Sequence, residues 1–173
     1  MVSELFLSIE FARTKVGIVM NQRKYTSKLI LELGLGGSKP ACSPLDANQR
    51  LTSIEFDKAV NDPDKDDSDK PLTDINKYQR LVGRLLYLTM TRVDISFAVQ
   101  VLSQFMHAPK VSHMEAALRV VRYINCSPGL GLFMPSQSNH LLTAYCDSDW
   151  GTCPQTRRFV TGYLVKFGDA LVS

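Results

Sequence analysis

The strongest constraint on the fold of this chain is a helical repeat of apolar residues in its centre. Between Asp74 and Ile124, apolar side chains recur every three or four positions in three successive stretches. This spacing places them on one face of each α-helix, and such faces are stable when they are buried against one another. The sequence therefore predicts three amphipathic helices packed as a compact unit.

Polar residues mark the starts of these predicted helices. Asp74 and Asp94 each precede an apolar helical run, where an aspartate can accept hydrogen bonds from the first free N–H groups. Ser112 and Glu115 match the capping-box pattern ahead of the third helix. We therefore expect one helix after each cap, the second of them running through Met106.

Different patterns flank the helical centre. The first residues form two apolar strands around a turn at residues 14–17, and a short helix follows and ends at glycines 34, 36 and 37. After Gly131 the apolar period changes to two, and strands are predicted at 141–147 and 159–167. The fold class is therefore α+β, with an N-terminal β-hairpin and helix, a three-helix unit and a C-terminal sheet.

The charge of the chain is unevenly distributed. Residues 55–70 hold seven acids and three lysines, a net charge of −4, so the rest of the chain carries +7 out of a total of +3. A polar, aperiodic and acidic run is typical of a solvated linker. We expect it to separate 1–54 from 71–130, with a further division before 131–173. The basic remainder suits a polyanionic partner.

Several classes of protein are disfavoured. No apolar run approaches the roughly 20 residues that span a bilayer, and the first residues lack the pattern of a secretory signal. The cysteines include no C-x-x-C pair, so we expect reduced thiols. These features predict an intracellular protein, cytoplasmic or nuclear, with no membrane partner and no small-molecule substrate. The cysteines are Cys42, Cys126, Cys146 and Cys153.

Two rows of basic residues are candidates for contact with nucleic acid. Lys77, Arg80 and Arg84 recur at helical spacing on the first predicted helix, and Arg119 and Arg122 do so on the third. Such rows can bind phosphates. The alternative is that each row forms part of an ordinary solvated helix face.

The stretch LTAYCDSDW, which begins at Leu142, ends an alternating strand on two acids. Strands of metal-dependent nucleases place carboxylates at such a position. Other chemistries lack support, because the three histidines are isolated in the sequence and no G-x-S-x-G motif occurs.

Four blocks in this order resemble the Pol polyprotein of copia-type long-terminal-repeat retrotransposons along essentially the whole chain. They are YQRLVGRLLYLTMTRVDISFAVQVLSQFM, ALRVVRYI, GLGLFM and LTAYCDSDWGTCPQTRRFVTGY. The resemblance implies that residues 1–54 end the reverse transcriptase palm and start the thumb. Residues 71–130 would form the thumb and connection, and residues 131–173 the start of a ribonuclease H-like domain.

This resemblance bears on the candidate residues. The family usually reads F-L-G where this chain has Phe6, Leu7 and Ser8, in a region that approaches the primer strand. The thumb of the parent enzyme grips the template and primer backbone, which favours phosphate contacts by the two basic rows. Asp147 corresponds to the first metal-binding carboxylate of ribonuclease H, which uses two magnesium ions in the intact enzyme.

Neither catalytic site of that family is complete in this sequence. The other ribonuclease H carboxylates would follow the last residue, and no Y-x-D-D motif of the polymerase occurs. We therefore expect a polyprotein fragment that is catalytically inactive alone, needs no cofactor, and binds an RNA–DNA hybrid or a DNA or RNA backbone weakly. The alternatives are an orphan product with no selected function, and a hybrid nuclease completed by another chain.

Overall fold

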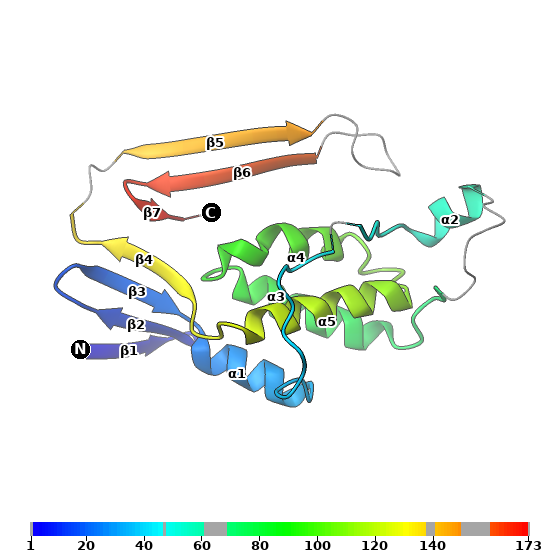
Figure 1. Ribbon diagram of the computed structural model, residues 1–173, viewed down its shortest axis with the longest axis horizontal. Helices are drawn as coiled ribbons and strands as arrows, with labels where there is room; N and C mark the ends of the chain where they lie inside the picture. The colour runs from blue at the N-terminus through cyan, green and yellow to red at the C-terminus, as the bar shows by residue number, and fades with distance from the viewer. Residues whose placement is uncertain (1, 47, 61–68, 138–140, 150–159, 173) are drawn as a thin grey trace.

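The computed structural model describes residues 2–46, 48–60, 69–137, 141–149 and 160–172. This part of the chain is a mixed α and β structure with five α-helices and two antiparallel sheets. Figure 1 shows the first sheet and the helices side by side beneath the second sheet, with α1 beside the first sheet and α4 below the second. The chain therefore has the mixture of helices and sheets that its sequence predicts.

The first sheet has the strand order β1-β2-β3-β4. The predicted turn at residues 14–17 is confirmed, since the Thr14 N–H and hydroxyl both donate to the Gly17 carbonyl. One expectation was wrong, because the predicted first strand is divided by a reversal at Leu7 and Ser8. The strand after Leu130 joins this sheet, where it pairs with residues 17–21. The strands are β1 (Val2–Phe6), β2 (Ile9–Arg13), β3 (Gly17–Asn21) and β4 (Gly131–Pro135).

A close backbone approach explains the glycine at the start of β4. Gly131 pairs with Asn21 of β3. A Cβ atom at Gly131 would lie 2.0 Å from the Met20 carbonyl oxygen, which is far inside van der Waals contact. Only glycine fits this position without a shift of the backbone, and it anchors a pairing between segments that are more than one hundred residues apart.

The helices follow the predicted order with one addition. They are α1 (Arg23–Glu32), α2 (Ile54–Val60), α3 (Ile75–Leu88), α4 (Ser96–Ser103) and α5 (Val111–Asn125), with a 3-10 turn, η1 (Val93–Ile95), before α4. Gly34 ends α1 with a φ of +67°, the left-handed conformation that glycine adopts at low cost. The N–H groups of Gly34 and Leu35 then donate to the carbonyls of Leu31 and Ile30.

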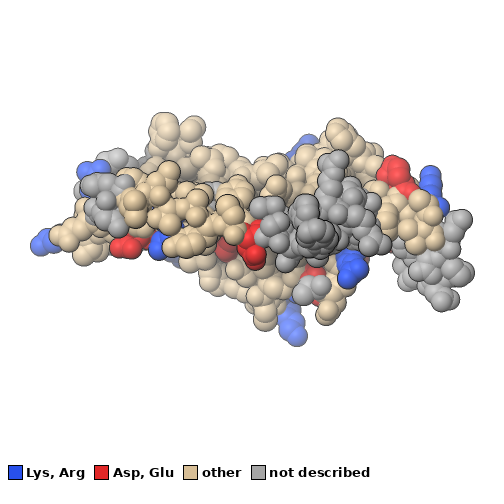
Figure 2. Space-filling view, turned by 90° about the horizontal axis from the view of Figure 1, so that it is seen from above, with Lys and Arg blue, Asp and Glu red and all other residues tan. Residues whose placement is uncertain are grey.

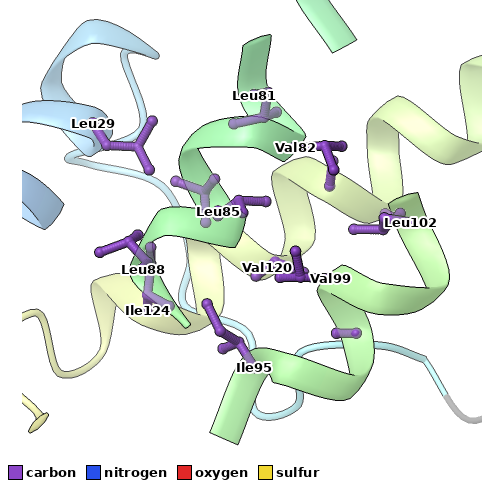
Figure 3. Packing of buried hydrophobic residues seen from close by; sticks show 14 of the residues in the cluster. Leu29, Leu81, Val82, Leu85, Leu88, Ile95, Val99, Leu102, Val120 and Ile124 are labelled. Atoms are coloured by element: carbon purple, nitrogen blue, oxygen red, sulfur yellow. The ribbon is translucent and has the colours of Figure 1, made fainter. Parts of the chain in front are cut away.

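The core lies among α1, α3, α4 and α5. Figure 3 shows Leu85, Val99 and Val120 meeting from three different helices, with Leu29 of α1 closing one side. All four side chains are fully buried. The core therefore consists of the apolar stripes that the periodicity predicts, and burial of each large side chain contributes roughly 1.5–3 kcal/mol.

The predicted helix ends are only partly correct. The Asp74 carboxylate accepts from the Lys77 N–H at 3.0 Å and is the N-cap of α3, as expected. Asp94 does not cap a helix, because both of its oxygens accept from the guanidinium of Arg92. The second helix ends at Ser103 instead of Met106, since the chain tightens there into i to i+3 hydrogen bonds.

The expected capping box of the third helix was also wrong. Lys110 is the N-cap of α5, and its N–H donates to the side chain of His113. Ser112 instead donates through both its N–H and its hydroxyl to the carboxylate of Asp69. An acid from a distant segment thus takes the place that Glu115 was expected to fill.

The acidic segment 55–70 is not wholly irregular, as a solvated linker would be. Helix α2 occupies its beginning, and Asp57 and Asp69 both contact Lys110. The local sequence gives no sign of these distant contacts, which order the two ends of the segment. Residues 61–68 lie outside the described residues, and the domain boundaries remain a prediction.

The second sheet has the order β5-β6-β7, with β5 (Leu142–Asp149), β6 (Val160–Phe167) and β7 (Ala170–Leu171). The two strands predicted from the period-two pattern pair antiparallel along eight residues, from Leu142 opposite Phe167 to Asp149 opposite Val160. Phe159 and the turn that joins the strands lie outside the described residues. None of the described helices is long and apolar enough to cross a membrane.

Candidate nucleic-acid interface

The basic row of α3 lies beside the buried stripe of that helix. Lys77 and Arg80 are exposed, while the adjacent Tyr78 and Leu81 are buried. Neither cation forms an ion pair with a carboxylate among the described residues. Both side chains therefore face solvent with no described carboxylate beside them, as phosphate binding requires.

Arg84, the third member of this row, is engaged within the protein. Its guanidinium lies 2.5 Å from the Glu32 carboxylate of α1 and 5.7 Å from the centre of the Tyr25 ring. The Tyr25 ring meets Tyr87 edge-on at 5.2 Å, and the Tyr87 hydroxyl donates to the carbonyl of Leu7. Arg84 thus helps to join α1, α3 and the β1–β2 turn, and Glu32 offsets its charge.

The two arginines of α5 differ in the same way. Arg119 donates to the Ser43 hydroxyl at 3.1 Å and lies 3.7 Å from the Asp46 carboxylate. The guanidinium of Arg122 is half-buried and makes no ion pair with a described residue. Of the five predicted residues, Arg84 and Arg119 are therefore paired with carboxylates. The other three, Lys77, Arg80 and Arg122, have no carboxylate partner among the described residues.

Figure 2 gives the distribution of charge on the face seen from above in the view of Figure 1. On this face, the described Lys and Arg residues are scattered among neutral and acidic ones. They form no continuous basic patch there among the residues that the structure describes. The cations without a described carboxylate partner, Lys77, Arg80 and Arg122, lie on α3 and α5.

Asp147, the candidate catalytic and metal-binding residue, is exposed on β5 and lies opposite Gly162 of β6. Two magnesium ions need several clustered oxygen ligands. Among the described residues, no group of three or more His, Cys, Asp or Glu side chains could hold a metal ion. The donor set around Asp147 that the structure describes does not fit a magnesium centre.

Sequence reasoning missed a cluster of charged residues at the start of α5. The Lys110 ammonium is only 3% exposed and lies 2.6 Å from Asp57 and 2.7 Å from Asp69. Burial alone would lower the pKa of Lys110, but the two carboxylates outweigh it and raise this pKa above its ordinary value of 10.5. Nothing in the local pattern distinguishes this lysine from a solvated one.

His113 completes this cluster. Its Nδ1 accepts from the Lys110 N–H at 3.0 Å, its Nε2 lies 3.2 Å from the Thr52 carbonyl oxygen, and its ring stacks on Phe105 at 3.9 Å. Burial, assisted by the charge of Lys110, lowers its pKa from 6.5 to about 4. His113 is therefore a neutral, structural histidine, consistent with the sequence, in which it is isolated from other metal-binding residues.

Comparison with known proteins identifies relatives over nearly the whole chain. The "Retrovirus-related Pol polyprotein from transposon RE1" of Arabidopsis thaliana is 34% identical over 97% of this chain and 11% of its own length. The corresponding polyprotein from transposon TNT 1-94 of Nicotiana tabacum is 29% identical over 98% of this chain and 12% of its own length.

A shorter relative is matched over most of its length. The "Uncharacterized mitochondrial protein AtMg00240" of Arabidopsis thaliana is 47% identical over 45% of this chain and 70% of its own length. No protein-family model matches the chain. No solved structure matches it significantly. Both Pol polyproteins align along almost all residues of this chain, which supports an origin in a retrovirus-related Pol polyprotein of a transposon. The chain spans 11% of the RE1 polyprotein.

Proposed function

We propose that this chain is the part of a copia-type Pol polyprotein that joins reverse transcriptase to ribonuclease H, and that it binds the backbone of nucleic acid without turning it over. The observation that carries the proposal is the pair of exposed cations on α3. Lys77 and Arg80 have no carboxylate partner among the described residues and project from a helix whose opposite side is buried. A nucleic-acid partner implies a cytoplasmic or nuclear location.

The contacts of the other basic residues refine this proposal. Arg84 and Arg119 contribute less to binding, because Glu32 and Asp46 already neutralise them. Arg122 contributes from the neighbouring helix, where no described acid offsets its charge. Binding of this kind does not depend on the base sequence, because only phosphates are contacted. We therefore expect similar affinity for an RNA–DNA hybrid and for duplex DNA of equal length.

Fluorescence anisotropy with a labelled RNA–DNA hybrid tests the binding proposal. Each phosphate contact contributes about −0.9 to the slope of log affinity against log salt on duplex DNA. The double variant Lys77→Ala with Arg80→Ala should therefore bind more weakly and flatten this slope by about 2.

The matched control removes two exposed cations from a distant turn, Arg13→Ala with Lys15→Ala. It lowers the net charge equally and should leave the slope nearly unchanged. If both double variants weaken binding alike, only net charge matters and the α3 interface is wrong. A wild-type protein whose binding ignores salt would favour the product with no selected function.

The catalytic part of the proposal needs its own assay. We expect no cleavage of a labelled RNA–DNA hybrid by the purified chain in magnesium or manganese, because the described residues gather no set of metal ligands around Asp147. Cleavage that disappears in Asp147→Asn would overturn this expectation. It would show that a second copy of the chain or other residues complete the site.

A further inference from the structure

Residues 35–46 form a segment that runs antiparallel along the second half of α5. The Asn125 amide donates to the Leu35 carbonyl at 3.3 Å, and the Ala41 N–H donates to the Arg122 carbonyl at 3.5 Å. Further along the segment, Ser43 and Asp46 contact Arg119. As the residue numbers of the segment rise, those of its partners on α5 therefore fall.

This arrangement brings two exposed cysteines together. Cys126 ends α5, and its thiol donates to the Ala41 carbonyl oxygen at 3.5 Å. Cys42 is the next residue after Ala41, and both cysteines are free and exposed. In a trans peptide the following Cα lies roughly 3 Å from such an oxygen, so the Cys126 sulfur is within about 6.5 Å of the Cys42 Cα.

The two thiols therefore lie on neighbouring stretches of backbone. Bridged cysteines have Cα atoms up to about 6.8 Å apart and an S–S bond of about 2 Å. At this point the backbone of the segment is held by the long hydrogen bond from Ala41 to Arg122. A bridge requires Cys42 to move toward the end of α5, and this long hydrogen bond is the backbone contact next to Cys42 that would have to adjust.

We propose that Cys42 and Cys126 are a reversible oxidation site, whose disulfide fastens the 35–46 segment to the end of α5. A small-molecule disulfide such as glutathione disulfide is the oxidant. One cysteine thiolate attacks it, forms a mixed disulfide and releases one glutathione thiolate. The second cysteine thiolate attacks the cysteine sulfur of this mixed disulfide and releases the second glutathione thiolate. Two protein thiols are thereby oxidised, and one glutathione disulfide is reduced to two thiols.

Oxidation would change both the stability of the chain and the freedom of Arg119. The bridge would link residues 84 positions apart, which restricts the unfolded chain strongly. It would also hold Ser43 and Asp46 near Arg119, because both lie within four residues of Cys42. In a reducing compartment such a bridge is transient, as expected of a regulatory disulfide.

The test is treatment of the full purified chain with glutathione disulfide, followed by non-reducing electrophoresis and peptide mass spectrometry. We expect a monomer of increased mobility that contains a peptide linking Cys42 to Cys126 and reverts with dithiothreitol. In Cys42→Ser or Cys126→Ser the second step is blocked, so a glutathione adduct should accumulate on the remaining cysteine.

Two further measurements keep the test decisive. A double variant, Cys146→Ser with Cys153→Ser, should still form the bridge. Oxidation should raise the melting temperature of this double variant and of the wild type. It should not raise the melting temperature of Cys42→Ser. Native circular dichroism of each reduced protein shows that it is folded. Glutathione adducts that persist on both cysteines of a folded wild-type protein, or bridges that form only between chains, would overturn the proposal.

Discussion

The ammonium group of Lys110 lies 2.7 Å from Oδ2 of Asp69, and that carboxylate also accepts from the N–H and the hydroxyl of Ser112. A single acid therefore pairs with a buried lysine and also caps the first turn of α5. Asp57 approaches the same ammonium at 2.6 Å from the side of α2. The three charges fix both ends of the acidic segment on the helical core.

We predict that Lys110→Met destabilises the protein by about 2–4 kcal/mol. The substitution leaves two partly buried carboxylates without their cation, and an unpaired charge in such a place is costly. Urea denaturation at pH 7 measures the change. The control is Lys77→Met, which removes an exposed lysine of the neighbouring helix and should cost less than about 0.5 kcal/mol. Equal effects of the two variants would show that the Lys110 cluster adds nothing to stability.

Stability should also depend on pH through His113. Its pKa is about 4 in the folded protein and near 6.5 when unfolded. Between these values the unfolded chain binds more protons, so stability falls as the pH drops from 6.5 toward 4, and this residue causes no further loss below that range. The full effect is about 3 kcal/mol.

Urea denaturation at pH 7 and pH 5 checks this prediction. His113→Gln should be less stable than the wild type at pH 7 but should lose less stability between the two pH values. His107→Gln, at an exposed histidine, should keep the pH dependence of the wild type. The same pH dependence in wild type and His113→Gln would contradict a neutral, buried imidazole.

A third prediction concerns the pairing of β4 with β3 in the first sheet. Gly131→Ala should cost about 1–3 kcal/mol, because the new methyl group would collide with the Met20 carbonyl oxygen and push β4 away from β3. Thermal melting gives the comparison. Gly162→Ala is the control, since the nearest atom to its added Cβ would be 4.0 Å away, and it should be nearly neutral.

The central helices were predictable because their signal is local. The spacing of Leu81, Leu85 and Leu88 is enough to define a buried helical face, and Asp74 needs only its own helix to act as a cap. The period-two pattern likewise identified β5, which carries Asp147, and its partner strand β6. Each of these features depends on residues within a few positions of one another.

The features that sequence reasoning missed depend on contacts between distant segments. Pairing of β4 with β3 joins residues more than one hundred positions apart, and the alternation of apolar residues cannot choose the partner strand. The burial of Lys110 and the pairing of Arg84 and Arg119 likewise require acids from other segments. Basic residues at helical spacing look the same whether they bind phosphate or a carboxylate of their own chain.

The last prediction concerns the turn between β1 and β2. Leu7 and Ser8 have φ values of +48° and +60°, and Phe6 pairs with Ile9 on either side of them. A two-residue hairpin turn with both φ values positive favours asparagine and glycine, because a Cβ atom is strained there. Ser8→Gly should therefore stabilise the protein by about 0.5–1 kcal/mol. Ser8→Ala retains the strain and serves as the control, with a change near zero. Urea denaturation of the three proteins decides the matter, and a Ser8→Gly protein less stable than the wild type would mean that the serine side chain itself supports the turn.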